Sequence, residues 1–491
     1  MTRDAALAGL VPALRRAWEK DPQPPRLVSI FGRSVGQETE VHYLFDRGAA
    51  DYEETTVMAG GEIGSLVPLA PAASWHEREI HDRFGVIFAG HPDPRPLLGP
   101  WQPAPPASAP NGTRRWPPDA AAGVGAEFVP VTGNGVTEVA VGPVHAGIIE
   151  PGHFRFSTMG DRVIFLELRH FYTHKGTEDL LAGMEAAGAT PIAESVSGDN
   201  CLAHAVAYCQ ALERIAGVEP PPRAQALRCV GMELERLVNH IGDFGALCGD
   251  VGFAPMPALA SRLKEDLLLA SLAFCGTRYW RGIAVPGGVT VDPGEQARAA
   301  LARAIAAAGR EFAELGGRAL RNPSVQARFD GAGVLTPQAA SDFAAVGPVA
   351  RASGAPLDLR RDRPYGAYRR RAVAAARLAA GDVMARAQIR MLEAAAAVEF
   401  LRATLADWPP GNVRDRFPAG AEGRGWAAVE SPRGELVYWL LLQQGRIVRC
   451  HIRSPSFQNW PALPPAVIGG IIADFPMINK SFNLSYSGCD R

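Results

Sequence analysis

The chain has 491 residues, too many for one compact core, and this length predicts two or three domains. Its 50 lysines and arginines nearly balance 51 aspartates and glutamates, so the net charge of −1 gives no overall field that would attract nucleic acid or an anionic membrane surface. An apolar fraction of 47% excludes a disordered chain, and the longest apolar runs fall far short of the roughly 18 residues that cross a bilayer.

The cysteines and the N-terminus bear on the compartment. Seven cysteines without a CxxC spacing fit a reducing compartment better than a disulfide framework. The first twenty residues form an amphipathic pattern interrupted by charge and lack the apolar centre of a signal peptide. We therefore expect a cytoplasmic protein that reaches a membrane, if at all, from its side.

The first part of the chain predicts a small α/β domain, residues 1–101. Strands are expected at RLVSIFG and VHYLF, and a helix at 75–84. Ten prolines then lie between Pro92 and Pro118, too many fixed φ angles for a helix or a central strand. Residues 102–127 are therefore interpreted as a proline-rich linker.

The remainder, 128–491, predicts a mainly helical domain with flanking strands, so the expected fold class is α+β. Short strands are expected at 137–141, 153–157 and 163–168, and helices over 224–247, 370–406 and 466–473. Near the C-terminus, GELVYWLLL and GRIVRCHIR predict a hairpin across Gln443, Gln444 and Gly445.

Common motifs for nucleotide binding and zinc binding do not indicate a function for this chain. Neither a phosphate loop nor a GxGxxG between a strand and a helix is present. His170 and His174 lack a third ligand at zinc spacing and are interpreted as a structural pair. The loop GPVHAGIIEPGHFRF, 142–156, is more informative because it gathers glycines, prolines and histidines around Glu150. That carboxylate is either a proton relay with a pKa raised by burial or a turn residue.

Several stretches together carry a resemblance to a known family. The 128–491 region resembles the large subunit of membrane-bound, energy-converting nickel-iron hydrogenases, which is homologous to the quinone-site subunit of respiratory complex I. The matching stretches are GPVHAGIIEPGHFRF, HKGTED, ELERLVNHIGD, SPRGE, IRSPSFQNW and DFPMINKS. SWHEREIHDRFGVIFAGHPDPRPLL, 74–98, resembles the peripheral C-type partner subunit, and a fusion of the two is itself a pattern of that family.

The resemblance implies a nickel-iron centre held by two CxxC pairs, of the forms ERVCGIC and DPCxxC. Laid over this chain, the four ligand positions fall on Ser197, Asn200, Ser485 and Gly488. Hydroxyl and amide groups cannot bridge nickel and iron as thiolates do, so we expect no metal in this chain. Cys201 and Cys489, each one position further on, are interpreted as buried structural cysteines, with an unrelated metal as the alternative.

The complex I relatives imply a histidine and a tyrosine at the quinone headgroup. His145 matches the histidine, whereas Gly198 stands at the tyrosine's position. The expected catalytic residues are Glu150, His145 and Arg433, and His145 with His153 is expected to line a quinone or small-molecule cleft. Arg433 either pairs with an anionic or carbonyl group or forms a salt bridge with a helix acid.

Three functions follow from the resemblance. The first is a subunit of a complex I-like respiratory oxidoreductase of the NADH dehydrogenase type, peripheral on the inner face of the cell membrane. It would receive electrons from a small iron-sulfur subunit, bind membrane-arm subunits but no nucleic acid, and pass electrons to quinone or another small molecule. The second is an active hydrogenase, and the third is a scaffold without a site. The first is favoured because the polar loop residues are retained: His145, Glu150, His153, Arg433 and Asp474.

Overall fold

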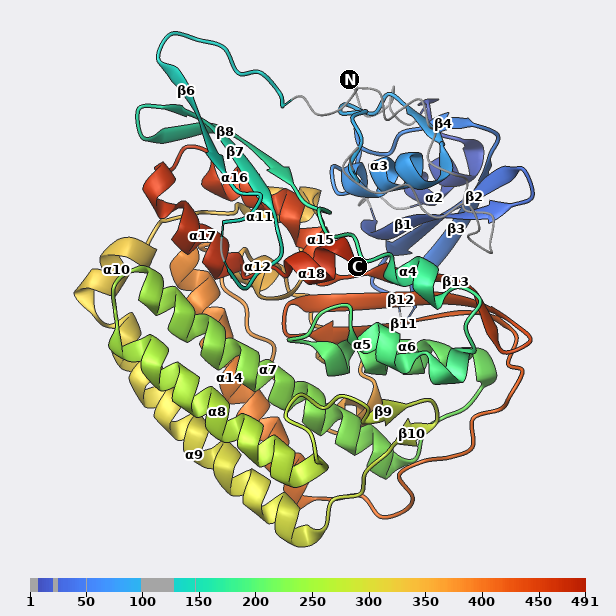
Figure 1. Ribbon diagram of the computed structural model, residues 1–491, viewed down its shortest axis with the longest axis vertical. Coiled ribbons are helices and arrows are strands. Elements are labelled where there is room, and N and C mark those ends of the chain that lie inside the picture. Colours follow the sequence, from blue (N-terminus) through green and yellow to red (C-terminus); the bar gives the residue numbers. More distant parts are fainter. Residues whose placement is uncertain (1–7, 21–24, 50, 99–127, 146) are drawn as a thin grey trace.

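The computed structural model describes residues 8–20, 25–49, 51–98, 128–145 and 147–491. The chain forms an α/β part at its N-terminus and a larger helical part that carries two three-stranded sheets and one two-stranded sheet, which confirms the α+β class (Figure 1). The linker expected at 102–127 lies outside the described residues. Among the described helices, none combines the length and the apolarity that crossing a membrane requires.

The N-terminal part is built on one antiparallel sheet in the order β1-β2-β3. A tight turn at Gly36, where φ is 61°, joins β1 to β2 and pairs Val35 with Glu38. Helix α3 packs on β1 and ends at Gly85, whose φ of 71° suits a C-cap. The elements are α2 (Pro12–Glu19), β1 (Arg26–Val35), β2 (Glu38–Asp46), β3 (Glu53–Ala59), β4 (Glu62–Gly64), α3 (Ala73–Phe84) and β5 (Ile87–Ala89).

A second antiparallel sheet, β6-β7-β8, opens the larger part. Its strands, β6 (Val136–Val141), β7 (His153–Met159) and β8 (Arg162–Arg169), confirm the three short strands expected from the sequence. Two short helices follow, α4 (Thr177–Leu181) and α5 (Thr190–Glu194), before the long helices begin.

The long helices form the body in the lower part of Figure 1. Helix α7 lies between α8 and α14, and α9 packs on α8 and α14. They are α6 (Cys201–Ala216), α7 (Pro222–Asp250), α8 (Pro255–Cys275), α9 (Glu295–Leu320) and α14 (Val383–Ala406). Smaller elements fill the connections: β9 (Ala284–Val285), β10 (Gly288–Val289), α10 (Pro323–Phe329), α11 (Pro337–Asp342), α12 (Gly347–Ala352) and α13 (Leu359–Asp362).

The third sheet, β11-β12-β13, crosses the centre of the molecule with α6 against one face (Figure 1). Its strands are β11 (Gly423–Ser431), β12 (Gly434–Gln443) and β13 (Arg446–Arg453), and the β12-β13 turn at Gln444 and Gly445 confirms the expected hairpin. Four short helices end the chain: α15 (Pro455–Asn459), α16 (Leu463–Val467), α17 (Phe475–Phe482) and α18 (Tyr486–Asp490).

The two parts meet where the β1-β2-β3 sheet packs on the β11-β12-β13 sheet. Phe31 is stacked between His42 and His451, at ring-centroid distances of 4.7 Å and 4.4 Å. Glu178 of α4 accepts hydrogen bonds from Arg83 of α3 at 2.8 Å and from Arg449 of β13 at 2.7 Å. Burial alone would raise the pKa of Glu178, but Arg449 and the other cations around it hold that pKa well below its ordinary value.

Two helix predictions were wrong in their extent. The helix expected at 370–406 begins only at Val383, because Gly381 takes a φ of 67° and the Asp382 side chain accepts the Ala385 amide as an N-cap. The helix expected at 466–473 ends at Val467, just before Gly469 with a φ of 89°. Strand β11 was not predicted, because glycines and alanines dilute its alternation.

Candidate functional site

Two loops far apart in the chain meet at the candidate site. Ser197 lies in the loop between α5 and α6, Ser485 lies between α17 and α18, and their Oγ atoms are 3.0 Å apart. The Gly488 amide donates to Ser485 Oγ at 2.8 Å, and a Cβ added to Gly488 would lie 3.2 Å from the Ser485 Cβ and 3.6 Å from the Ser197 Cβ. Three of the four positions singled out from the sequence are therefore neighbours.

The fourth position, Asn200, is the last residue of the loop between α5 and α6, here called the first loop. Its amide donates to the Ser197 carbonyl at 3.3 Å, and it stands immediately before the first turn of α6. The side chain is 2% exposed, and its Oδ1 has no hydrogen-bond partner among the described residues. A buried acceptor without a partner is energetically costly. We therefore expect a water molecule or a ligand group to donate a hydrogen bond to this oxygen.

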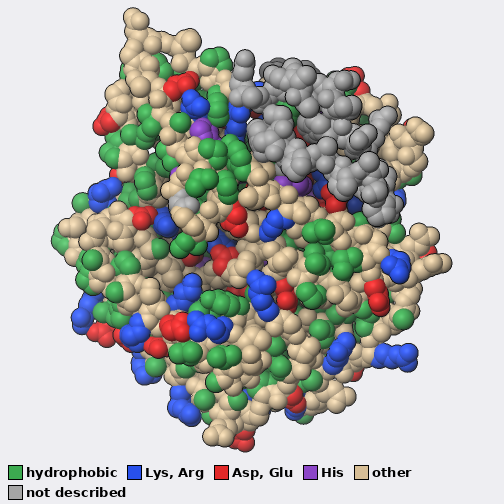
Figure 2. Space-filling model, in the orientation of Figure 1, with side chains coloured by type: hydrophobic (Ala, Val, Ile, Leu, Met, Phe, Trp, Pro, Cys, Tyr) green, Lys and Arg blue, Asp and Glu red, His purple; other side chains and the backbone are tan. Residues whose placement is uncertain are grey.

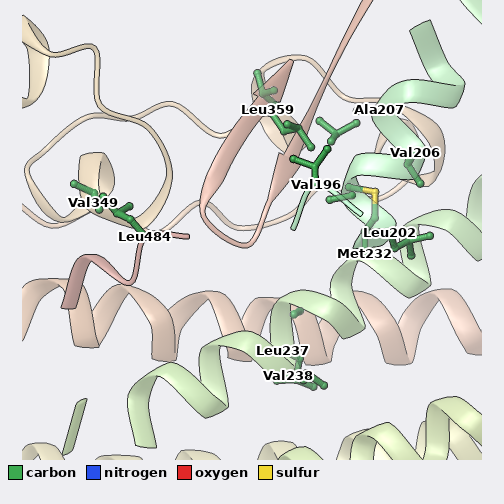
Figure 3. Packing of buried hydrophobic residues seen from close by; sticks show 14 of the residues in the cluster. Val196, Leu202, Val206, Ala207, Met232, Leu237, Val238, Val349, Leu359 and Leu484 are labelled. Atoms are coloured by element: carbon green, nitrogen blue, oxygen red, sulfur yellow. The ribbon is translucent and has the colours of Figure 1, made fainter. Parts of the chain in front are cut away.

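Apolar packing holds these loops in place. Val196 and Leu202, on either side of the first loop, and Leu484, next to Ser485, are buried in the main core with Met232 of α7 (Figure 3). Since each serine is flanked by a buried apolar side chain, moving either loop would open the core. The site is therefore fixed by packing as well as by hydrogen bonds.

Arg433 and Asp199 form the charged side of the site. Arg433 Nη2 donates to Asp199 Oδ2 at 2.5 Å, and Asp199 Oδ1 accepts from Ser197 Oγ at 2.8 Å. Burial would raise the pKa of Asp199, but the Arg433 guanidinium lowers it below the ordinary value. Arg433 Nη1 is buried without a partner among the described residues, which leaves one directed donor for another group.

His204 of α6 is a second residue whose side chain has a buried nitrogen without a hydrogen-bond partner among the described residues. Its Nδ1 is 2.8 Å from the Tyr438 hydroxyl, and its Nε2 is buried without a partner in the described part of the chain. Burial, with the nearby charge of Lys175, lowers the pKa of His204 to about 3, so the ring is neutral. A neutral ring can donate or accept at Nε2 according to its tautomer.

Lys175 ties the two loops together from the other side. Its Nζ donates to the carbonyls of Ser195 (3.1 Å) and Val196 (2.7 Å) and to Ser487 Oγ (2.6 Å). Burial lowers the pKa of Lys175, whereas the charges of Glu150 and Asp490 act in the opposite direction. Glu150 is therefore close enough to Lys175 for its charge to act on the ammonium.

His145 lies at the edge of the same region. Its Nε2 is 3.2 Å from the Tyr486 hydroxyl, burial lowers its pKa, and Tyr486 also packs on His170. Gly152 permits this contact, because a Cβ there would lie 2.4 Å from the Tyr486 ring. Beside His145 the loop is open, with Val144 78% and Ile148 99% exposed.

His153 packs on Phe128 at a ring distance of 4.8 Å, and alternation along β7 places it on the opposite face from Phe154. Its Nδ1 donates to the Gly142 carbonyl at 3.1 Å, and a Cβ added to Gly142 would lie 3.2 Å from the His145 ring, so both histidines border the same glycine. His170 is enclosed by aromatic rings, Trp460 among them at 4.2 Å, while His174 Nδ1 donates to the Asp490 carbonyl at 2.9 Å. These two histidines do not share a ligand position, in line with the structural interpretation.

A small cavity of about 40 Å³ adjoins the site and is lined by Gly198, Asp199, Cys201 and Glu235 among others. Glu235 accepts the amides of Leu202 and Ala203 at the start of α6, and burial raises its pKa to about 8. Cys201 donates its thiol to the Tyr279 carbonyl, and burial raises the pKa of both Cys201 and Cys489. Both cysteines are buried, as expected.

The described residues contain no group of three or more His, Cys, Asp or Glu side chains placed to hold one ion. The polar groups that do converge are hydroxyls, an amide, a guanidinium and a neutral imidazole.

Sequence reasoning did not single out Lys175, Asp199, His204 or Tyr486. Lys175 lies inside the HKGTED motif and Asp199 inside the first loop, so proximity to a motif was the available signal for these two. His204 and Tyr486 lie in ordinary helical and C-terminal sequence, and only the fold shows that they face the site.

Comparisons with known proteins agree on one family. Residues 8–106 match the family model of the 30 kDa subunit of respiratory-chain NADH dehydrogenase, and residues 250–421 and 414–491 match that of the 49 kDa subunit. The chain is 30% identical over 445 residues to formate hydrogenlyase subunit 5 of Escherichia coli, covering 88% of this chain and 77% of that protein. It is 32% identical to the carbon monoxide-induced hydrogenase of Rhodospirillum rubrum, across 72% of this chain and 99% of that protein.

A solved structure shares the fold. The membrane-bound sulfane sulfur reductase, an archaeal respiratory membrane complex, contains a chain that superposes with a TM-score of 0.67 at 23% identity. The match covers 73% of this chain and 99% of that one.

Proposed function

Because this chain belongs to the family that unites hydrogenase large subunits with the 49 kDa subunit of respiratory-chain NADH dehydrogenase, here fused to a 30 kDa-type domain, we propose that it is the large subunit of a complex I-like oxidoreductase that works without a nickel-iron centre. In this proposal it takes electrons from an adjacent iron-sulfur subunit and passes them to quinone or another small molecule. Relatives named as parts of a membrane-bound complex support a place on the inner face of the cell membrane, against membrane-arm subunits.

The observation that carries the proposal is the hydrogen bond between Ser197 and Ser485. The resemblance places nickel-iron ligands at these positions, and the two hydroxyls instead satisfy each other at 3.0 Å. Nickel and iron are bridged by soft thiolates, whereas serine stays protonated at neutral pH and glycine offers no ligand atom. The residues present do not fit the metal centre of the relatives, so no step of the proposed reaction runs through one.

The acceptor is proposed to bind beside His145. The 40 Å³ cavity accommodates about one water molecule, too little for a quinone headgroup. His145, half-buried and next to the exposed Val144 and Ile148, offers a polar anchor at an apolar surface. Glu150, close to Lys175, is proposed to deliver the proton, and Arg433 to orient the site through Asp199.

The size of that cavity favours a second candidate, a non-catalytic subunit that couples the peripheral arm to the membrane arm. Pockets that bind small molecules usually measure about 300–1,000 Å³, far above the volume beside Asp199. The two candidates differ in whether Glu150 affects turnover.

Two measurements on the purified complex test the proposal. Nickel is expected well below one atom per chain, and one atom per chain would overturn the metal-free site. With dithionite as electron source and a short-chain ubiquinone as acceptor, Glu150→Gln is expected to lower the rate at least tenfold with subunit composition unchanged. Glu185→Gln, on an exposed segment, is the matched control. An unchanged rate for Glu150→Gln would favour the coupling subunit.

A further inference from the structure

One edge of the central sheet is covered along only half its length. At the β13 edge, Arg449 donates to the Gly32 carbonyl and α4 packs against the strand. At the β11 edge, the segment around α13 covers the end near Glu430: Tyr365 OH accepts the Glu430 amide at 2.9 Å. From Arg424 to Ala428, the described residues meet the same edge only where Arg214 approaches the Trp426 carbonyl.

Hydrogen bonds at Glu430 and Trp426 fix which backbone groups face outward. The Glu430 amide and carbonyl both bond away from β12, the carbonyl to Arg236 Nη2 at 2.6 Å, and the Trp426 carbonyl lies 3.5 Å from Arg214 Nη1. Since strand backbone alternates, the N–H and C=O of Ala428 point the same way. Within the described part of the chain, these Ala428 groups bond to no other residue.

These unpaired groups border a cavity of about 570 Å³. Its walls come from both parts of the chain and include Asp51, Arg214, Leu359, Tyr365, Trp426 and Ala428. The charges on its rim already have partners: Arg214 pairs with Asp51, and Arg369 pairs with Glu219 at 3.0 Å. Among the described residues, the groups left without a partner here are the Ala428 N–H and C=O of β11, rather than a charge that would call for an ion.

We propose that an extended segment of another subunit adds to β11 as a fourth strand along Arg424–Ala428. Unpaired edge groups are what an added strand recognises, and native sheets normally cover them. The chain covers the Glu430 end of the edge with its own segment, and the cavity leaves room beside Ala428 for backbone at the usual interstrand spacing of about 4.8 Å. Small side chains at Ala427 and Ala428 leave the approach open.

The inference rests on the proposed function only in requiring other subunits. A photoreactive phenylalanine analogue at Arg424, whose side chain is 56% exposed, reports on the edge in the purified complex. The same probe at Glu314, 62% exposed on α9, is the control. We expect position 424, but not 314, to cross-link to one peptide of another subunit.

Ala428→Pro removes the outward amide without touching β12, and edge strands tolerate proline. It is expected to reduce the cross-link at least tenfold, whereas Ala428→Ser, which keeps the amide, should retain it. A cross-link to this chain itself, to a second copy or to none, or one undiminished by Ala428→Pro, would overturn the inference.

Hydrogen exchange gives a reading without any variant. The peptide spanning 424–428 should exchange at least tenfold more slowly in the complex than in the full chain alone, and equal rates would overturn the added strand. A preparation with no other subunit would instead contradict the proposed function, which separates the two failures.

Discussion

At the residue scale, Lys175 is the side chain on which the geometry of the site most depends. Its ammonium bonds two backbone carbonyls of the first loop and Ser487 of α18 at once. Lys175→Met would leave the carbonyls of Ser195 and Val196 without this donor, and we expect a loss of about 1–3 kcal/mol in the free energy of unfolding. Chemical denaturation of the purified chain measures it.

Lys264→Met is the control for this change. Lys264 lines the 40 Å³ cavity and makes no hydrogen bond to the described residues, so its loss should stay within about 0.5 kcal/mol. Equal effects of the two substitutions would show that Lys175 does not hold the loops.

The meeting of Ser197, Ser485 and Gly488 could be predicted from the family resemblance, because the two ligand pairs of the relatives fall on these positions. The partners around them could not. His204 and Lys175 reach the site through the packing of α6 and α4, which depends on contacts between residues far apart in the chain. The contact of His153 with Phe128 could not be predicted either, because it joins β7 to a residue that lies before β6.

At the scale of elements, α18 is anchored to the turn after β8 by one carboxylate. Asp490 accepts the amides of Phe171 (2.9 Å) and Thr173 (3.2 Å) and the Thr173 hydroxyl (2.9 Å). Burial nevertheless raises the pKa of Asp490 to about 6. The folded chain therefore binds this proton more tightly than the unfolded chain does.

The pH dependence follows from that sign. The contribution of Asp490 to stability is fully present below its ordinary pKa of about 4 and is lost as pH rises through about 6. The melting temperature of the wild type relative to Asp490→Asn should fall between pH 4 and pH 7. A difference that is constant over this range would contradict the raised pKa.

Element prediction succeeded where a local pattern suffices. The β12-β13 hairpin and the β6, β7 and β8 strands show clear alternation or a glycine turn, whereas α14 starts late because Gly381 and Asp382 stop the helix within an alanine-rich run. Strand β11 was not predicted, because the formation of a glycine- and alanine-rich strand depends on packing against its neighbours more than on its own sequence.

At the scale of the whole molecule, Glu178 joins the two parts. It is buried and accepts from Arg83 on one side and from Arg449 and the Ile452 amide on the other. Glu178→Gln would leave buried guanidinium groups without their counter-charge, and we expect a loss of about 3–5 kcal/mol. Denaturant midpoints of the full chain test this.

Asp179→Asn is the matched control, since Asp179 is half-exposed and contacts the same Arg83. Its effect should remain below about 1 kcal/mol. Comparable losses for the two substitutions would mean that the contact between the two parts is not centred on Glu178.

The mixed charges on the face shown in Figure 2 agree with the balanced composition, and the fold class followed from the order of the segments. The close contact between the first and third sheets did not follow, because nothing in the sequence states that Phe31 lies between His42 and His451.

The ring of cations around Glu178 also constrains how the gene can vary. Arg83, Arg449 and Arg491 come from three distant stretches of the chain and share this one carboxylate. Losing any one of them changes the charge that the others experience. Substitutions at these positions are therefore expected to occur together during evolution. Changes within the first hundred residues should accompany changes within the last fifty.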